Sequence, residues 1–159
     1  KSMVGINTQS TNKIVKHGLQ NNLIQEFKDV LSIKPETKFG LNTRFDFLIT
    51  SKKYKAFVEV KNVTLSRKRK VAEFPDAITS RGLKHINELM KASKKGYKIF
   101  ILYLIQRNDC NLFTIAKDID IEYAKALSKA VKNNLKILCY DCKFSSKGIK
   151  MNNKINFKL

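Results

Sequence analysis

Two carboxylates and a lysine occur together in a stretch of the chain that is otherwise apolar. Asp46 lies in the run 44–49, and Glu59 and Lys61 lie in the run 56–61; both runs are rich in aromatic and β-branched residues. Such composition is typical of β-strands. Because side chains alternate between the faces of a strand, Glu59 and Lys61 are expected on one face. Two carboxylates beside an ammonium group can hold a divalent cation together with a phosphate or a water.

The polar residues 50–53 predict a hairpin turn that joins these two strands. If the turn is centred between Lys52 and Lys53, Asp46 lies directly opposite Glu59, with the side chains roughly 5 Å apart. Like charges that face each other across a sheet are destabilising, so packing gives no reason for this pair. A divalent cation between the carboxylates would remove the repulsion. Two interpretations stay open, a metal site and a pair of surface charges.

The spacing of these residues resembles a known nuclease signature. Twelve residues separate Asp46 from Glu59, and one residue separates Glu59 from Lys61. This is the pattern of the restriction-endonuclease-like, or PD-(D/E)xK, fold, with Phe45 in place of the usual proline. The bare pattern is short and often arises by chance. What favours it here is that two adjacent predicted strands keep the acidic residues in phase.

The chain is strongly basic. Its 159 residues include 32 lysines and arginines against 13 aspartates and glutamates, which gives a formal net charge of +19. This length predicts one domain with its own core. So strong a positive field favours a polyanionic partner, most simply a nucleic acid. An AT-rich genome would also add lysine codons, but that bias exchanges arginine for lysine and leaves the shortage of acidic residues unexplained.

No segment of the sequence has the length of a transmembrane helix. The longest apolar run, 99–105, is far too short to cross a bilayer, and no signal peptide is visible. We therefore expect a cytoplasmic protein that has neither a membrane partner nor a small-molecule cofactor.

Further basic residues flank the predicted hairpin. The run 67–70 reads Arg-Lys-Arg-Lys, which is typical of a solvated loop, a targeting signal or a phosphate-binding segment. Near a carboxylate site, binding of the phosphate backbone is the favoured interpretation. A helix that begins near residue 81 also brings its positive dipole end to an anion. His85 in this helix is alternatively a plain surface histidine, or a general base with no identified partner. The candidate nucleic-acid contacts are Arg44, Arg67, Lys68, Arg69, Lys70, Arg81, Lys84 and His85.

Hydrophobic periodicity predicts the remaining elements. An apolar helical stripe covers 11–31, and Glu26 projects into it. Its carboxylate either reaches Asp46 and Glu59 or stays on an exposed flank. Pro35 is expected to break the chain before a strand that starts at 38–40. The later elements are expected as a helix at 81–95, strands at 98–105 and 112–115, a helix at 120–133, a strand at 136–140 and a terminal hairpin around 152–153. This order predicts a mixed α/β fold with helices on both faces of a mixed sheet.

Several segments resemble the sugar fermentation stimulation protein family of bacteria and archaea. They are Val4 to Thr8, Phe45 to Phe47, Val58 to Leu65 and Phe74 to His85. The similarity covers essentially the whole chain. In that family an OB-like domain precedes a PD-(D/E)xK-like nuclease domain, so the resemblance implies that residues 1–159 are the nuclease-like domain alone. The chain departs from its relatives at His17 and Gly18, where Glu-Ala is more usual, and at Thr43, where serine is usual.

The resemblance implies a role for each matching residue. Asp46, Glu59 and Lys61 would be catalytic, and Asp46, Glu59 and Glu26 would hold Mg²⁺ or Mn²⁺. We therefore expect a DNA-binding protein with a Mg²⁺-dependent phosphodiesterase site. The alternative is a DNA-binding or regulatory module that keeps the nuclease fold without cleaving. An RNA-binding protein is disfavoured, because the sequence lacks the exposed aromatic platforms expected for single strands.

Overall fold

The protein is described here by a computed structural model, which covers residues 2–5, 7 and 10–159. Ile6 and Thr8, in the segment Val4 to Thr8 quoted above, lie outside the described residues. The helices are α1 (Thr11–Gln20), α2 (Ser80–Lys94) and α3 (Ile121–Lys132). The strands are β1 (Val30–Phe39), β2 (Thr43–Ser51), β3 (Lys55–Val63), β4 (Leu65–Lys68), β5 (Val71–Phe74), β6 (Lys98–Ile105), β7 (Leu112–Ile115), β8 (Lys136–Ser145), β9 (Gly148–Lys154) and β10 (Asn156–Lys158).

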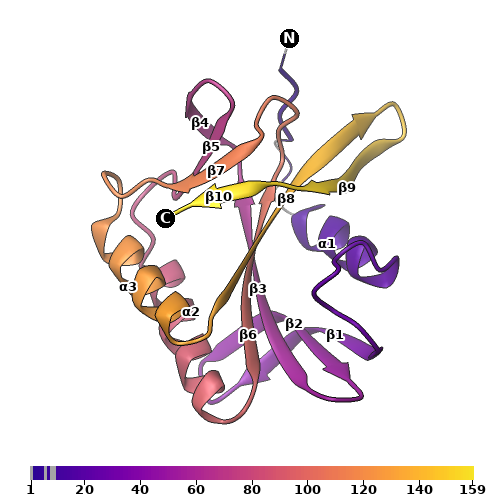
Figure 1. Cartoon of the computed structure of the whole chain (residues 1–159), viewed down its shortest axis with the longest axis vertical. Helices are drawn as coiled ribbons and strands as arrows, with labels where there is room; N and C mark the ends of the chain where they lie inside the picture. The colour runs from indigo at the N-terminus through magenta and orange to yellow at the C-terminus, as the bar shows by residue number, and fades with distance from the viewer. Residues whose placement is uncertain (1, 6, 8–9) are drawn as a thin grey trace.

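A six-stranded mixed sheet runs through the centre of the molecule in the order β1-β2-β3-β6-β8-β9 (Figure 1). The strands β3, β6 and β8 are parallel, and the pairs at either side are antiparallel. The middle strand β6 is buried from Ile99 to Ile105. A strand covered on both faces needs apolar residues at every position, which is why 99–105 shows no alternation.

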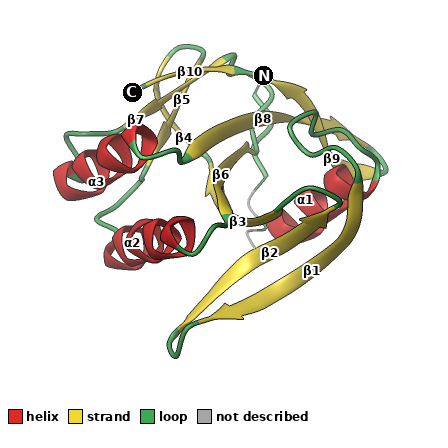
Figure 2. Cartoon of the chain, turned by 60° about the horizontal axis from the view of Figure 1, so that its bottom comes forward, coloured by secondary structure: helices red, strands yellow, loops and turns green. Residues whose placement is uncertain are grey.

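Helices cover both faces of this sheet, as predicted. One apolar cluster includes Val15 and Leu19 of α1, and the other includes Leu89 of α2 and Leu127 of α3. Figure 2 shows α2 and α3 together on one side and α1 on the other. The expectation of a mixed α/β fold with a mixed sheet between helices is confirmed.

The basic run 67–70 belongs to a second, four-stranded sheet of order β10-β7-β5-β4. Its residues end β4 and form the turn into β5, where Lys70 has a φ of 65°. The strand β10 pairs in parallel with β7. The hairpin predicted around 152–153 is wrong, because the last hairpin turns between Ser145 and Gly148 and residues 152–153 lie inside β9.

The predictions for the first forty residues also need correction. The helix α1 ends at Gln20, and Asn22 adopts a left-handed φ of 55°, which ends helices readily. Ile24 and Phe27 are buried in the turns that follow, so the apolar stripe continues although the helix does not. Pro35 does not break the chain but lies inside β1, at the sheet edge, where proline is tolerated.

The helices α2 and α3 begin within one residue of their predicted starts at 81 and 120. The Thr79 hydroxyl accepts a hydrogen bond of 3.0 Å from Gly82 N at the start of α2, and the Asp120 carboxylate accepts one of 2.9 Å from Tyr123 N at the start of α3. Such caps satisfy backbone N–H groups that have no partner within the helix. Within the described part of the chain, no helix combines the length and the apolar character needed to span a membrane.

Candidate functional site

The hairpin of β2 and β3 has the register expected from the sequence. Phe47 pairs with Val58, and Thr50 pairs with Lys55, which centres the turn between residues 52 and 53. Pairing stops at Phe47 and Val58, whereas β3 continues beside β6 as far as Val63. Asp46 and Glu59 are the next positions after the last pair. They therefore lie where β2 separates from β3, and this leaves part of the β3 backbone without a strand partner.

The carboxylate of Asp46 fills that position. Its Oδ2 accepts a hydrogen bond of 2.7 Å from Val60 N, and its Oδ1 accepts one of 2.7 Å from the Asn12 amide at the start of α1. Burial and the neighbouring charge of Glu59 raise the pKa of Asp46, and the bonds from Val60 and Asn12 only partly offset them. Lys61 already provides one positive charge that lowers the pKa of Asp46, and a further positive charge nearby would stabilise the ionised carboxylate.

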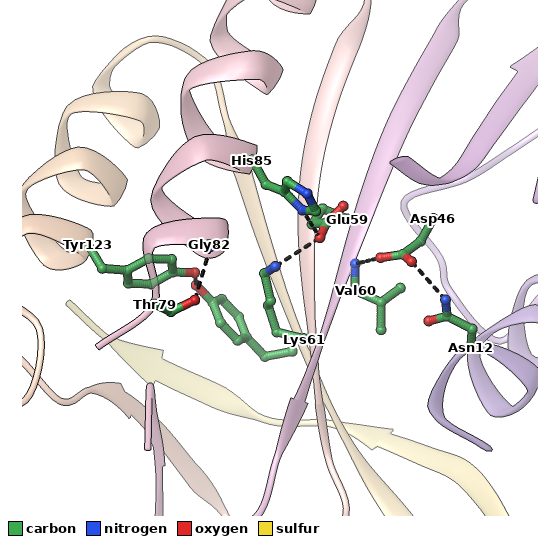
Figure 3. Close-up of polar contacts among 10 residues, drawn as sticks. Asn12, Asp46, Glu59, Val60, Lys61, Thr79, Gly82, His85 and Tyr123 are labelled. Atoms are coloured by element: carbon green, nitrogen blue, oxygen red, sulfur yellow. Dashed lines mark hydrogen bonds and ion pairs between the residues drawn. The ribbon is translucent and has the colours of Figure 1, made fainter. Parts of the chain in front are cut away.

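Glu59 is only 3% exposed and is held by two basic side chains. Its Oε1 contacts Nδ1 of His85 from α2 and accepts a hydrogen bond of 2.8 Å from the Lys61 ammonium. Burial alone would raise the pKa of Glu59, but the bonds from His85 and Lys61 lower it overall. Figure 3 shows Glu59 between His85 and Asp46, with Lys61 reaching the same oxygen as His85.

The other oxygen of Glu59, Oε2, is buried without any hydrogen-bond partner. A buried carboxylate oxygen left without a partner is costly, so it points to a missing ligand. The Asp46 carboxylate nearby keeps lone pairs beyond the two bonds it accepts. Hard oxygen donors of this type suit Mg²⁺, which is commonly held by one or two carboxylates with waters and phosphate completing its shell. The donor set of Asp46 and Glu59 therefore fits a magnesium-like cation.

The structure does not bring Glu26 to these two residues. Its carboxylate contacts the Lys154 ammonium and accepts a hydrogen bond of 3.2 Å from the Tyr140 hydroxyl. Burial opposes ionisation of Glu26, but these partners lower its pKa overall. Because α1 ends at Gln20, Glu26 lies in a turn and cannot be the helix-borne ligand that was expected. No group of three acidic, histidine or cysteine side chains able to hold a metal occurs among the described residues.

Arg67 has a structural environment that differs from the expected phosphate contact. Its guanidinium bonds both oxygens of Glu73, at 2.9 and 3.0 Å, and both oxygens of Asp118, at 2.5 and 2.9 Å. The bonds from Arg67 lower the pKa of both carboxylates, that of Asp118 to about 2. Arg67 is exposed like Lys68, Arg69 and Lys70, and it differs from them in being bound to two carboxylates.

The remaining basic candidates line one hollow of about 570 Å³, which reaches His85, the partner of Glu59. We call it the entry hollow; its lining residues are Asn42, Arg44, Ser80, Arg81, Lys84 and His85. Arg44 forms an exposed ion pair of 3.3 Å with Glu36, and the Lys84 ammonium donates a 3.0 Å bond to the Asn42 carbonyl. His85 is 7% exposed, so it is not a surface histidine. It lies between the entry hollow and Glu59.

Sequence reasoning did not identify two of the contacts in this site. His85 shares the buried side of α2 with Ile86 and Leu89, and this helical spacing could have indicated that it points inward. Its partner Glu59 lies 26 residues earlier and carried no signal of the pairing. Asn12 was not singled out, and nothing in its neighbourhood distinguishes it from other polar residues of α1.

Comparison with known proteins gives a consistent result. A family model described as "Sugar fermentation stimulation protein RE domain" matches residues 9–148. A sugar fermentation stimulation protein homolog of Pelagibacter ubique is 52% identical over 155 residues, covering 98% of this chain and 67% of that protein. The homolog of Roseobacter denitrificans is 38% identical over 156 residues, covering 98% of this chain and 66% of that protein. The chain thus spans about two thirds of the length of these relatives.

A solved structure is similar over nearly the whole chain. It is titled "The structure of Pyrococcus Furiosus SfsA in complex with Ca2+". Its TM-score to this chain is 0.88 at 26% sequence identity, and the match covers 97% of this chain and 66% of the other.

Proposed function

The chain belongs to the sugar fermentation stimulation protein family, and on that basis we propose that it binds DNA and hydrolyses phosphodiester bonds with Mg²⁺ held by Asp46 and Glu59. In this proposal β2, β3 and α2 form a PD-(D/E)xK-type core. The observation that carries it is the buried, unpartnered Oε2 of Glu59 beside a second carboxylate whose pKa is raised. Both features are explained together if a cation belongs between them.

Two further facts support the choice of cation. The similar protein from Pyrococcus furiosus is described as being in complex with Ca²⁺. Calcium and magnesium both take oxygen ligands, and Mn²⁺ accepts the same donors. When bound, Mg²⁺ would polarise the scissile phosphate and lower the pKa of an attacking water.

The chain's own residues have separate tasks in this site. Lys61 places its ammonium 2.8 Å from Glu59 Oε1, where it can also stabilise the negative charge that develops on a phosphate. His85 holds the same oxygen from the opposite side and so fixes the orientation in which Oε2 is free. The bonds from Asn12 and Val60 orient Asp46 in the same way. Fixed side chains of this kind reduce the reorganisation needed during the reaction.

DNA is the proposed substrate because the charge and shape around the site suit a polyanion. The net charge is +19, and Arg44, Arg81 and Lys84 line the entry hollow directly beside His85. Lys68, Arg69 and Lys70 add an exposed basic turn. Three free cysteines, Cys110, Cys139 and Cys142, are compatible with a reducing compartment, and we place this activity in the cytoplasm.

A cleavage assay tests the proposal. Purified protein is incubated with duplex, single-stranded and branched DNA in the presence of Mg²⁺, Mn²⁺ or EDTA. We expect metal-dependent nicking that Asp46→Asn, Glu59→Gln and Lys61→Met each reduce by at least about 10²-fold, the scale of a lost electrostatic contact in a transition state. The matched control is Asp29→Asn, which removes an exposed carboxylate far from the site in sequence. If the wild type binds DNA but cleaves none of these substrates with either metal, the chain is a non-catalytic DNA-binding module.

A further inference from the structure

A second hollow adjoins the entry hollow on the side of the β1–β2 turn. It measures about 590 Å³ and shares Asn42 and Lys84 with the entry hollow. We call it the side hollow. One wall is the turn with Leu41, and the other is the C-terminal half of α2 with Lys91, Lys94 and Lys95. The two hollows are therefore neighbours, and the bond between the Lys84 ammonium and the Asn42 carbonyl lies where they meet.

The charge along the two hollows is positive over the length of α2. From Arg81 to Lys95 the helix rises by about 21 Å, at about 1.5 Å per residue. Along it, Lys84, Lys91 and Lys95 follow Arg81 at helical spacing and are exposed. The acidic residue on this wall, Glu88, is paired with Lys91 at 2.6 Å. The wall therefore presents a net positive row to a polyanion.

An apolar side chain stands at the edge of the side hollow. Leu41 is 99% exposed at the tip of the β1–β2 turn, beside Gly40 with a φ of 64°. The bond from the Lys84 ammonium to the Asn42 carbonyl ties this turn to α2. The exposed leucine next to the lysines would lose its contact with water if an apolar part of a ligand covered it while the charged parts bound the lysines. An unstacked base with its phosphate has this combination of groups.

The exposed leucine selects the form of nucleic acid. In a duplex the bases are paired and stacked inside the helix, so a duplex would present only its phosphates to the lysine row and leave Leu41 without a base to contact. An unpaired strand presents both its phosphates and its bases, and Leu41 supplies an apolar contact in place of an aromatic platform. We propose that the side hollow binds a single-stranded extension of the substrate, with Lys91, Lys94 and Lys95 at its phosphates and Leu41 against a base.

This inference rests on the proposed function only in taking DNA as the ligand of the site, and it does not require cleavage. It is tested by fluorescence anisotropy in EDTA at fixed ionic strength. The probes are a blunt hairpin duplex and the same duplex with single-stranded extensions of increasing length at its 5′ or its 3′ end. We expect the wild type to bind one polarity of extension about tenfold more tightly than the blunt hairpin.

The variant that removes the row is Lys91→Gln/Lys94→Gln/Lys95→Gln. Its matched control on α3 is Lys125→Gln/Lys129→Gln/Lys132→Gln, which removes the same charge and likewise breaks one exposed i,i+3 pair, with Glu122 instead of Glu88. We expect the α2 triple variant to lose the gain from the extension and to lower the salt slope on extended DNA by about 2, at 0.7 per single-strand phosphate. The control should keep the gain.

Leu41→Ser separates the apolar contact from the charges. We expect it to reduce the gain from the extension several-fold without changing the salt slope. If the extension strengthens binding by the α2 triple variant as much as binding by the α3 control, or gives the wild type no gain at all, the side hollow does not hold a strand. The inference is then wrong while the proposed function stands. If the wild type binds no DNA of any form, it is the proposed function that fails.

Discussion

The backbone N–H of Val60 donates a 2.7 Å hydrogen bond to the carboxylate of Asp46, where a neighbouring strand would otherwise supply the acceptor. The parting of β2 from β3 after Phe47 and Val58 makes this bond possible. One side chain thus completes the sheet edge and at the same time stays beside Glu59, whose charge raises its pKa. The position that ends the hairpin pairing is therefore also the position of the proposed cation site.

Stability without metal should depend on pH through Asp46. Because its pKa is raised on folding, the associated stability is fully present below the unfolded value of about 3.9 and is lost as pH rises through the folded value. In EDTA we expect Asp46→Asn to gain stability relative to the wild type on going from pH 4 to pH 7. Urea unfolding at both pH values measures this. An equal difference at the two pH values would contradict the assignment.

Calcium should stabilise the wild type more than it stabilises Asp46→Asn. A ligand that binds only the folded state stabilises it, by about 2.7 kcal/mol at a concentration of 100 Kd. We expect the melting temperature of the wild type to rise with Ca²⁺ or Mg²⁺ and that of Asp46→Asn to rise less. A matched control is Asp141→Asn, which removes an acidic group on β8. A rise of the same size in all three proteins would place the cation elsewhere.

The contact of His85 with Glu59 should contribute strongly to folding. Removing one hydrogen-bond partner of a buried polar group costs about 1–3 kcal/mol, and Lys61 still holds the Glu59 carboxylate when His85 is removed. We expect His85→Ala to cost an amount of that order, and the double variant His85→Ala/Glu59→Gln to cost less than the two single variants added together. Exposed His17→Ala serves as the control. Additive losses in urea unfolding would show that the two side chains do not interact.

The same contact predicts the acid limb of stability. The pKa of Glu59 is lowered by His85 and Lys61 despite its burial. A lowered pKa gives stability that is present above the unfolded value of about 4.3 and is lost as pH falls through the folded value. We expect the wild type to lose stability below pH 4.3 and His85→Ala to show a shallower loss. Unfolding curves between pH 5 and pH 3 measure both slopes, and parallel slopes would remove His85 from the explanation.

The basic turn between β4 and β5 should divide into two functional parts. Lys68, Arg69 and Lys70 are exposed, so their replacement by alanine should lower the salt slope of duplex binding by up to about 2.7, at 0.9 per phosphate. Arg67→Ala should leave that slope unchanged and instead lower the unfolding free energy slightly, because its guanidinium is bound to Glu73 and Asp118. If the single variant Arg67→Ala lowers the salt slope of duplex binding, the arginine leaves Glu73 and Asp118 to bind DNA.

The sequence determined the local features of this protein. The register of the β2–β3 hairpin follows from the alternation of side chains and the length of the turn, and both act over a few residues. The caps at Thr79 and Asp120 follow from side-chain bonds to amides three residues ahead. The excess of basic residues needs no structure at all. These features could be predicted because the groups that decide them are neighbours in the chain.

Tertiary structure decided which polar side chains meet. Glu59 meets His85 across 26 residues, and Asp46 meets Asn12 across 34. Glu26 is drawn to Lys154 across 128 residues, and Arg67 to Asp118 across 51. A long polar side chain has many possible partners of similar energy, and the choice among them depends on how packed elements bring backbones together. That packing also left one oxygen of Glu59 without a partner, because β2 separates from β3 at that position while α2 reaches only the other oxygen.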